Sequence, residues 1–402
     1  MKYRLQGSVN LPGSKSESNR ALMIAAYGGF PFAVENLSEA HDTFLLKTLL
    51  ETTSSVVDCE DAGTVARFLL TYLANKPGTW LLTGTQRLCE RPMAPLIDAL
   101  RQLGADIAGE RLPLKIMGHP LKGGVVTLDV SQSSQFASSL LLAAPTWEKG
   151  LRLTMKGNPV SMPYLEMTIK MMEYFGVKVV REDNTITVAH QPYQPKSLTV
   201  SPDWSAASYW YEMMALGDGG SLLLKELKQD SLQGDAVVAD WFKCFGVTTS
   251  FETQGARLTK NDVAFAADFQ PLTFNFTNTP DLFPSVFVTC VMLHYQARFQ
   301  GIVNLLLKES NRVDSLISEL SKYYTFINIL MGDEIVIDKS LFSESLVNNN
   351  KVIINTYSDH RIAMALAPLL LRMNQVEFNN PLVVTKSYPA FWDELSKIHI
   401  PI

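Results

Sequence analysis

The sequence predicts an α/β protein of two domains that is built from six related units. Six apolar helices, each with polar residues at its start, alternate with six amphipathic helices, and short strand-like runs lie between them. Three amphipathic helices end at glycines, and these residues, Gly104, Gly176 and Gly246, stand 72 and 70 positions apart. A chain of 402 residues is too long for one ordinary core and suits two domains of roughly 200 residues each.

The first class of helix is apolar on nearly every face, and such helices are normally buried. Residues of the types that cap helix N-termini stand at each start, and Asp61 with Thr64 and Asp281 are the expected caps of the second and fifth helices. The expected helices of this class are Ser18–Ala26, Thr64–Ala74, Gln135–Ala144, Ser205–Leu216, Phe283–Tyr295 and His360–Arg372.

The second class of helix is amphipathic and is expected at the surface. Its members are expected at Ile97–Ala105, Ile169–Val177 and Val238–Val247, and more weakly at Phe44–Glu51, Leu316–Tyr324 and Phe391–Lys397. The intervening strand-like runs include Gly124–Asp129, Leu151–Met155 and Leu222–Leu224. A generic α/β chain with this alternation by chance is the alternative to repeated units.

Two breaks in the pattern set the expected domain boundaries. One lies at Leu11-Pro12, and the other falls near residues 196–203 after a proline-containing loop. We therefore expect an inserted domain of residues 13–199 with three units. A discontinuous domain of residues 1–12 and 200–402 would carry the other three.

Composition restricts the class of protein. Hydrophobic residues make up 47% of the chain and charged residues 19%, as in a globular protein. The net charge of −5 argues against a general nucleic-acid or membrane surface, while a local basic pocket for a small anion remains open. There is no apolar signal segment, and the cysteines and histidines lack metal-ligand spacing. We expect a cytoplasmic monomer with reduced cysteines that binds neither nucleic acid nor membranes.

The helix starts contain residues suited to binding anions. In the first, Lys15, Ser16 and Arg20 follow a glycine-containing turn, where unpaired backbone N–H groups and the helix dipole already favour negative charge. An ordinary serine cap with two solvated cations is the alternative for this motif alone. If all six starts converge on one cleft, it holds several cations, hydroxyls and carboxylates, and such a site binds more than one anionic group.

Eight short segments carry a resemblance to a known family. They are Leu11–Ser16 with Asn19-Arg20, Ala62–Thr64, Glu90–Met93, Ser133–Phe136, Pro280-Asp281, Lys308–Ser310 with Arg312, Ser358–Arg361 and Lys386–Pro389. In their content and order, the chain resembles the EPSP synthase (3-phosphoshikimate 1-carboxyvinyltransferase) family of enolpyruvyl transferases. Each segment alone is weak, whereas eight in the same order are specific.

The resemblance implies a fold and a reaction. The fold is an inside-out α/β barrel in which two domains each contain three βαβαββ repeats and the active site lies in the cleft between them. The reaction transfers the enolpyruvyl (carboxyvinyl) group of phosphoenolpyruvate to the 5-hydroxyl of shikimate 3-phosphate and releases phosphate, in chorismate and aromatic amino acid biosynthesis. It passes through a tetrahedral ketal and needs no redox or organic cofactor and no metal.

The resemblance also implies residue roles. Asp281 matches the base for the hydroxyl, Glu309 matches the second acid/base carboxylate, and Lys15 lies between the substrates; whether Lys15 or Glu309 protonates carbon stays open. The matches to shikimate 3-phosphate contacts are Lys15, Ser16, Arg20, Ser133, Ser134, Gln135, Ser161, Asp281, Asn304 and Lys308. The matches to phosphoenolpyruvate contacts are Lys15, Gly63, Arg91, Gln135, Arg312, Arg361 and Lys386.

Departures from the family pattern keep two alternatives open. Asp61 stands where the family usually has a neutral residue, Asn311 where it usually has an acidic one, and Met162 where it often has a basic one. A catalytically weakened homologue that only binds anionic ligands is therefore one alternative. The other is the sister enzyme that acts on UDP-N-acetylglucosamine and uses a reactive cysteine. Here Cys89 stands beside Glu90, whose carboxylate opposes thiolate formation, and we interpret this cysteine as incidental.

Overall fold

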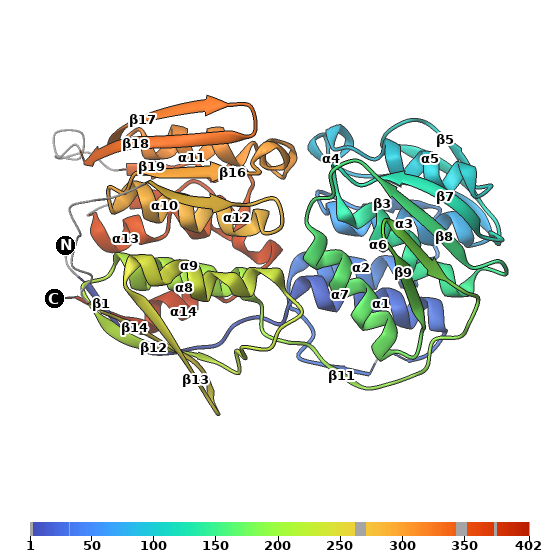
Figure 1. The fold of residues 1–402 in the computed structure, drawn as a ribbon, viewed down its shortest axis with the longest axis horizontal. Helices are drawn as coiled ribbons and strands as arrows, with labels where there is room; N and C mark the ends of the chain where they lie inside the picture. The colour runs from blue at the N-terminus through green and yellow to red at the C-terminus, as the bar shows by residue number, and fades with distance from the viewer. Residues whose placement is uncertain (1–2, 32, 262–270, 343–351, 374–375, 402) are drawn as a thin grey trace. The chain divides into compact units, whose positions relative to one another are not determined.

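The protein divides into two compact units, each with its own core. The computed structural model describes residues 3–31, 33–261, 271–342, 352–373 and 376–401. Unit 1 comprises Met1–Gly13 and Ser201–Ile402, and unit 2 comprises Ser14–Val200 (Figure 1). At the edge of unit 1 the two crossing segments lie side by side, because Gly13 forms a β-bridge with Pro202.

One sheet topology occurs four times, twice in each unit. The first and second strands are parallel, the second pairs antiparallel with the fourth, and the fourth pairs antiparallel with the third. In unit 2 the strands are β3 (Val56–Asp58), β4 (Gly78–Thr83), β5 (Asp106–Ala108) and β6 (Leu114–Gly118), then β7 (Gly124–Asp129), β8 (Leu151–Lys156), β9 (Val179–Glu182) and β10 (Thr185–Val188). In unit 1 they are β1 (Tyr3–Val9), β12 (Gly220–Lys225), β13 (Val247–Glu252) and β14 (Gly255–Lys260), then β15 (Leu272–Asn275), β16 (Ala297–Gln300), β17 (Tyr324–Met331) and β18 (Glu334–Phe342).

Two smaller parallel pairs complete the sheets in the described ranges. β19 (Val352–Ile354) pairs with β20 (Val376–Phe378) in unit 1, and β11 (Leu198–Thr199) pairs with β2 (Val34–Glu35) in unit 2. β21 (His399–Pro401) adds to the edge of β1. The part of each unit that the structure describes therefore contains three sheets, which agrees with three diverged repeats per unit.

The first strands of two repeats are exchanged along the chain. β1 precedes helix α1 (Lys15–Gly28) in sequence, yet it pairs with β12, which follows helix α8 (Trp204–Leu216). Conversely, β11 precedes α8 but pairs with β2, which follows α1. Unit 1 is therefore discontinuous, since its strand β1 comes from the N-terminal end of the chain, whereas unit 2 is continuous and pairs its last strand, β11, with its first, β2.

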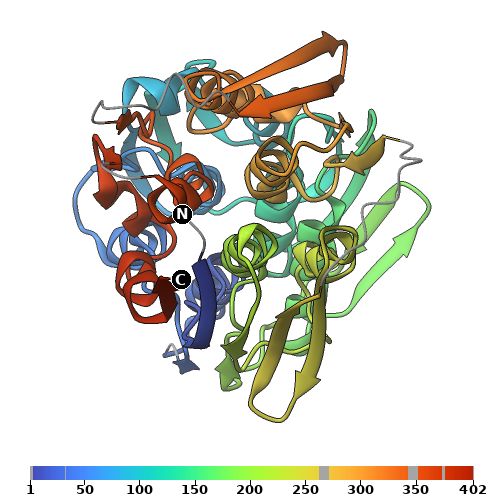
Figure 2. The same ribbon diagram turned by 90° about the vertical axis from the view of Figure 1, so that its left-hand side faces the viewer.

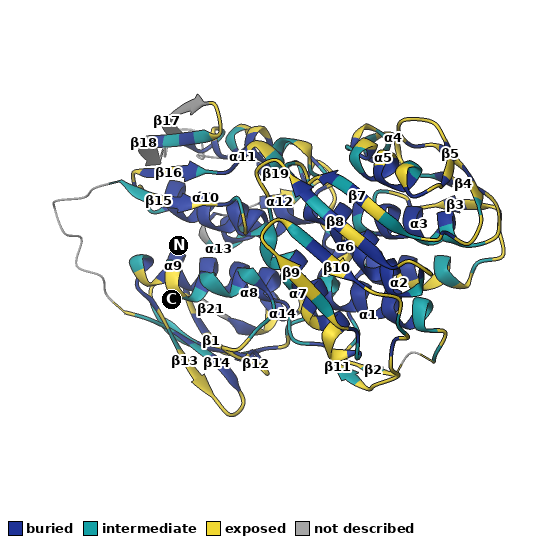
Figure 3. Cartoon of the chain, turned by 45° about the vertical axis from the view of Figure 1, so that its right-hand side comes forward, coloured by how far each residue is buried: buried dark blue, intermediate teal, exposed yellow. Residues whose placement is uncertain are grey.

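The predicted apolar helices are the interior helices of the two units. Besides α1 and α8 they are α3 (Gly63–Asn75), α6 (Ser134–Ala143), α10 (Phe283–Met292), α12 (His360–Ala365) and α13 (Pro368–Arg372). All residues of α8 and α10 are buried, which confirms the expectation for helices that are apolar on every face. In unit 1 the helices lie inside and hairpins such as β13–β14 lie at the periphery (Figure 2), and Figure 3 shows the same contrast in burial.

The amphipathic helices are confirmed as well. They are α2 (His41–Glu51), α5 (Ala94–Gln102), α7 (Met162–Tyr174), α9 (Val238–Trp241) with the 3-10 turn η3 (Phe242–Phe245), α11 (Arg312–Leu320) and α14 (Phe391–Ile398). Gly104, Gly176 and Gly246 adopt positive φ angles of 93°, 85° and 81°, the left-handed conformation of a closing glycine. The remaining short helices are α4 (Gln86–Glu90), η1 (Ala144–Thr146), η2 (Gly234–Val237), η4 (Pro280–Leu282), η5 (Val303–Leu307) and η7 (Pro381–Lys386).

Three local expectations were wrong. The helix expected at His360–Arg372 is divided, because Pro368 has no N–H to donate and starts a new helix, α13. Helix α3 begins after Ala62 without a side-chain cap, so Asp61 with Thr64 is not its cap. Asp281 lies in the turn η4 and does not cap α10, because its carboxylate is bound elsewhere.

Candidate active site

Arg312 is the centre of a charged cluster in unit 1. It is the first residue of α11, and its guanidinium reaches three carboxylates. Nη1 lies 3.0 Å from Asp281 Oδ1, Nη2 lies 2.8 Å from Glu309 Oε2, and Nε lies 2.9 Å from Asp359 Oδ2. Burial alone lowers the pKa of Arg312, but the three carboxylates outweigh it and hold the pKa above its usual value, so the guanidinium stays charged.

Asp359 links this cluster to the start of α12. Its Oδ1 accepts the backbone N–H of Arg361 at 3.0 Å, as a helix N-cap does, while Oδ2 accepts from Arg312 and, at 3.1 Å, from Ser310 Oγ. The Asp359 side chain is completely buried. One carboxylate therefore fixes both the helix that carries Arg361 and the guanidinium of Arg312.

Asp281 lies between the two arginines. Arg361 Nη2 is 2.6 Å from Asp281 Oδ2, while Arg361 Nη1 donates to the Tyr209 hydroxyl at 3.3 Å. Burial tends to raise the pKa of Asp281, but Arg361, Lys308 and Arg312 act against it and hold the pKa well below its ordinary value. The side chain retains 20% of its surface exposed, so the carboxylate is accessible as well as charged.

A second buried acid lies near Asp281. Asp235 in η2 accepts a short hydrogen bond from Ser205 Oγ at the start of α8, and its Oδ1 is buried without a hydrogen-bond partner among the described residues. Burial and then the charge of Asp281 raise the pKa of Asp235 to about 7, against which the Ser205 hydrogen bond acts. Asp235, which is bonded to the start of α8, and Asp281, which binds Arg361 near the start of α12, therefore act electrostatically on each other within unit 1.

The other predicted residues of unit 1 lie on the elements beside this cluster. Asn304 is in η5, and Lys308 follows η5 directly and acts electrostatically on Asp281. Lys386 is the last residue of η7, is buried, and belongs to a segment that packs on α12. Unit 1 therefore brings the predicted base, Asp281, and the second predicted carboxylate, Glu309, into one cluster with Arg312 and Arg361. The other predicted cations of unit 1, Lys308 and Lys386, lie on neighbouring elements.

In unit 2, Lys15 is held by an acid that the sequence analysis did not select. Lys15 Nζ lies 2.8 Å from Asp42 Oδ2, and the Asp42 side chain is only 3% exposed at the first turn of α2. The buried carboxylate of Asp42 therefore fixes the position of the Lys15 ammonium. The only sequence signal for Asp42 was an acidic residue in the first turn of a helix, a common feature.

Gly63 has a specific role at the start of α3. A β-carbon built on it would lie 2.6 Å from Nη1 of Arg91 and 2.8 Å from the central carbon of that guanidinium. Any larger residue at this position would therefore push the guanidinium away. Gly63 thus permits the close approach of the Arg91 side chain to the start of α3. The sequence analysis matched Gly63 instead to a contact with the ligand phosphoenolpyruvate.

Gln135 bridges the starts of α3 and α6. Its Oε1 accepts from Arg67 Nη1 at 2.6 Å, and its Nε2 donates to Thr64 Oγ1 at 2.9 Å. Seven residues after Thr64 in α3, the hydroxyl group of Thr71 lies 2.6 Å from that of Ser139 in α6. The two buried helices therefore run in the same direction, and their N-termini lie together.

Arg20 lies in the interior of unit 2. It donates to Thr168 Oγ1 at 2.7 Å, Ser16 O and Tyr164 O at 2.9 Å each, and Ser138 Oγ at 3.5 Å. Burial is the main cause that lowers its pKa, to about 10, and it remains a cation at neutral pH. These bonds connect α1, α6 and α7, so Arg20 positions three helices and has at most one guanidinium N–H left for a ligand.

The predicted serines lie at the same helix starts. Ser133 caps α6 by accepting from the Gln135 N–H at 3.2 Å, and Ser134 is the first residue of that helix. Ser16 follows Lys15 in α1. Ser161 precedes α7 with a positive φ of 55°, a conformation that non-glycine residues rarely adopt and that is often found at functional sites.

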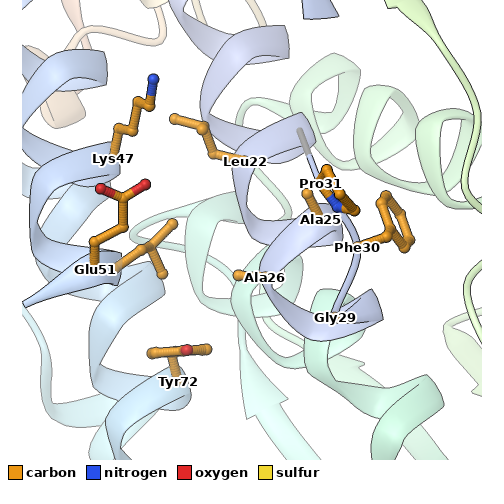
Figure 4. A pocket seen from close by; sticks show the side chains of 10 residues that line it. Leu22, Ala25, Ala26, Gly29, Phe30, Pro31, Lys47, Glu51 and Tyr72 are labelled. Atoms are coloured by element: carbon orange, nitrogen blue, oxygen red, sulfur yellow. The ribbon is translucent and has the colours of Figure 1, made fainter. Parts of the chain in front are cut away.

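A separate cavity of about 450 Å³ lies in unit 2 at the other end of α1 (Figure 4). Its lining includes Leu22, Phe30 and Tyr72, with Lys47 and Glu51 of α2 at one side. It contains none of the predicted site residues. Within the described ranges no group of three or more histidine, cysteine or acidic side chains is arranged to hold a metal, and no helix is long and apolar enough to cross a membrane.

Comparisons with known proteins extend over nearly the whole chain. The sequence model of the EPSP synthase (3-phosphoshikimate 1-carboxyvinyltransferase) family matches residues 45–395. The chain belongs to this family. The 3-phosphoshikimate 1-carboxyvinyltransferase of Bacteroides fragilis (strain YCH46) is 38% identical over 98% of this chain and 95% of its own length. That of Vibrio campbellii is 30% identical over 98% of this chain and 97% of its own.

Solved structures show the same fold. The EPSP synthase of Acinetobacter baumannii superposes with a TM-score of 0.75 and 22% identity, covering 99% of this chain and 96% of that one. The enolpyruvyl transferase NikO of Streptomyces tendae gives a TM-score of 0.70 at 13% identity, covering 99% and 97%. The predicted two-domain inside-out α/β fold of enolpyruvyl transferases is thereby confirmed.

Proposed function

We propose that this EPSP synthase family member transfers the enolpyruvyl group of phosphoenolpyruvate to the 5-hydroxyl of shikimate 3-phosphate and releases phosphate. Relatives of this activity at 30–38% identity cover 98% of the chain. The observation in the structure that best supports the proposal is the sharing of Arg312 by the two acid/base carboxylates, Asp281 and Glu309. A base and an acid that act on one substrate must lie within reach of the same atoms.

The proposed chemistry assigns each group a step. Asp281 takes the proton of the 5-hydroxyl as its oxygen bonds to the central carbon of phosphoenolpyruvate, and Glu309 or Lys15 gives a proton to the methylene carbon. In the tetrahedral ketal that results, the methyl group then returns a proton to the group that donated it, Glu309 or Lys15, as the C–O bond to phosphate breaks. The double bond is restored and phosphate leaves. Fixed cations stabilise the negative charges of both substrates during these steps.

We propose that the predicted binding residues act in two groups. Lys15, Arg91 and Gln135 of unit 2, with Gly63 allowing Arg91 its position, bind phosphoenolpyruvate together with Arg312, Arg361 and Lys386 of unit 1. Contacts to shikimate 3-phosphate come from Ser16, Arg20, Ser133, Ser134, Ser161, Asn304 and Lys308, with Lys15, Gln135 and Asp281 shared. The substrates then bind between two domains, residues 13–199 and residues 1–12 with 200–402, and the protein acts as a cytoplasmic monomer.

One assay tests the activity. Purified protein is incubated with both substrates, and phosphate release is followed with a coupled reaction. We expect release that requires shikimate 3-phosphate and that stops when it is omitted. Absence of release, with shikimate 3-phosphate binding intact, would instead identify the weakened homologue that the departures at Asp61, Asn311 and Met162 left open.

A further inference from the structure

Asp281 makes the contacts that a ligand carboxylate would make. Its two oxygens accept from two different guanidinium groups, Arg312 Nη1 at 3.0 Å and Arg361 Nη2 at 2.6 Å. These are the two arginines to which the proposed function assigns the anionic substrate. Arginine binds carboxylate and phosphate through such paired N–H groups, so the side chain of Asp281 already uses the N–H groups that an anion would need.

The exposed fractions of the side chains show which carboxylate partner of the arginines an incoming anion can replace. Arg312 is 1% exposed, Asp359 is not exposed at all, and Glu309 is 12% exposed, whereas Asp281 retains 20% of its side-chain surface. Asp359 is also fixed by two further hydrogen bonds, from the Arg361 backbone and from Ser310. An anion that approaches from solvent therefore reaches the two guanidinium groups most directly where Asp281 lies.

We propose that Asp281 is the internal counter-ion of the anion site formed by Arg312 and Arg361, and that a carboxylate or phosphate ligand binds there by displacing Asp281 from both. The inference rests on the proposed function only in treating this pair of arginines as a ligand site. It gives Asp281 a second role besides that of a base. Anion binding and the release of Asp281 become one event.

The exchange has a consequence for proton transfer. The charged and titratable groups that act on Asp281 come from several elements: Arg361 from α12, Lys308, Glu309 and Arg312 from the segment before and at the start of α11, Asp235 from η2 and Tyr209 from α8. Asp359, the N-cap of α12, shares Arg312 with Asp281. While both guanidinium groups contact it, the pKa of Asp281 is low and the carboxylate is a weak base. Once an anion takes the arginines, burial and the neighbouring Glu309 and Asp235 act to raise this pKa, so Asp281 becomes a stronger base only when the anionic substrate is bound.

The first experiment measures anion affinity by calorimetric titration, with phosphoenolpyruvate and, separately, with sulfate as probes. The proteins are the wild type, Asp281→Asn and the control Asp314→Asn, which removes an exposed carboxylate two residues after Arg312. We expect Asp281→Asn to bind both anions about fivefold more tightly or better, because no internal carboxylate competes. Asp314→Asn should stay within about twofold of the wild type, since exposed charges are strongly screened.

Equal or weaker binding by Asp281→Asn than by the wild type overturns the proposal. Turnover is measured in parallel and separates the two claims. A wild type without phosphate release, combined with tighter anion binding by Asp281→Asn, removes the proposed function and leaves the counter-ion. Normal wild-type turnover, combined with unchanged anion affinity in Asp281→Asn, removes the counter-ion and leaves the proposed function.

A second experiment keeps the carboxylate and does not depend on the folding of Asp281→Asn. Aspartate labelled with carbon-13 at the carboxyl group is titrated by NMR in the wild type, and the Asp281 signal is assigned by its loss in Asp281→Glu. We expect the pKa of Asp281 to be below the ordinary range without sulfate and to rise when sulfate saturates the site. A pKa that is unchanged or falls with sulfate contradicts the displacement.

Discussion

Arg312 and Asp359 form a fully buried ion pair at 2.9 Å, and the same carboxylate caps the helix that carries Arg361. One side chain therefore contacts both arginines that we propose to bind the anionic substrate. We expect Asp359 to act as a positioning residue, because it holds the guanidinium of Arg312 and the backbone N–H of Arg361 and so acts on a substrate only through these arginines.

Replacement of Asp359 by Asn should weaken both phosphoenolpyruvate binding and folding. Asn keeps an oxygen for the Arg361 backbone N–H but loses the charge that holds Arg312, which retains Asp281 and Glu309. We expect KM for phosphoenolpyruvate to rise about tenfold, with unfolding free energy lower by about 1–3 kcal/mol. Steady-state kinetics and urea unfolding measure both. Ser310→Ala, which removes only one hydroxyl bond to Asp359, is the control, and an equal KM effect there would contradict the assignment.

Removal of the proposed base should separate turnover from substrate binding. Asp281→Ala leaves Arg312 with two carboxylate partners, so the cluster stays intact. We expect phosphate release to fall by about 10²–10⁴-fold, while shikimate 3-phosphate still binds in a calorimetric titration. A variant with a near-normal rate would show that another group takes the hydroxyl proton.

Gly63 allows a test of the position of Arg91. In Gly63→Ala the new methyl carbon would lie 2.6 Å from Arg91 Nη1, so the guanidinium must move. We expect KM for phosphoenolpyruvate to rise about five- to tenfold, with little loss of stability because alanine favours helices. Gly29→Ala is the control: its φ is 65° and its β-carbon meets no atom within 4 Å. It should lower stability by about 1 kcal/mol and leave KM unchanged, and the same pattern in both variants would contradict the prediction.

We expect the buried Glu212 to make the unfolding free energy of the protein depend on pH, independently of the candidate active site. Glu212 lies in α8, is completely buried, and neither carboxylate oxygen has a hydrogen-bond partner among the described residues. Burial raises its pKa well above the ordinary value, so the folded protein keeps this carboxyl protonated where the unfolded chain ionises. The folded state then binds the extra proton, and stability falls as pH rises from the unfolded pKa towards the folded one.

Glu212→Gln should remove this part of the pH dependence. We expect the difference in unfolding free energy, variant minus wild type, to become more positive between pH 5 and pH 8, by up to about 1.4 kcal/mol for each pH unit within the window. Urea unfolding at three pH values measures it. The exposed Glu173→Gln should show no such trend, and parallel curves for wild type and Glu212→Gln would show that Glu212 ionises normally.

Ligand binding should also change the dimensions of the protein. If both units supply cations to the substrates, as proposed, an anionic ligand would offset the mutual repulsion of these cations. We expect shikimate 3-phosphate at saturation to lower the radius of gyration measured by small-angle X-ray scattering. An unchanged scattering curve at saturation counts against domain closure, and a non-binding phosphate ester at equal ionic strength controls for salt effects.

Local features were predictable because their causes are local. Periodic apolar residues identified the buried helices, and the closing glycines identified the ends of three others. The order of eight motifs indicated the family before any coordinates. Pro368 was visible in the sequence too, and its break in the last apolar helix was missed because the apolar run continues through it.

Partnerships between distant charges were not predictable in the same way. Nothing in the sequence distinguishes Asp42 from any other first-turn acid, yet its burial makes it the partner of Lys15, 27 residues away. Asp281 had the sequence features of a helix cap, but arginines 31 and 80 residues further along bind its carboxylate. Arg20 had the features of a ligand contact, but its hydrogen bonds position three helices.

The sequence by itself therefore determined the helices, their burial, the repeated units and the family, because these follow from side-chain periodicity and from motifs within a few residues. Tertiary structure alone decided which carboxylate each cation contacts and which first strand completes which sheet. Ion pairing depends on separations of a few ångströms between residues that are remote in the chain, and strand exchange depends on chain crossings. Neither leaves a local pattern in the amino acids.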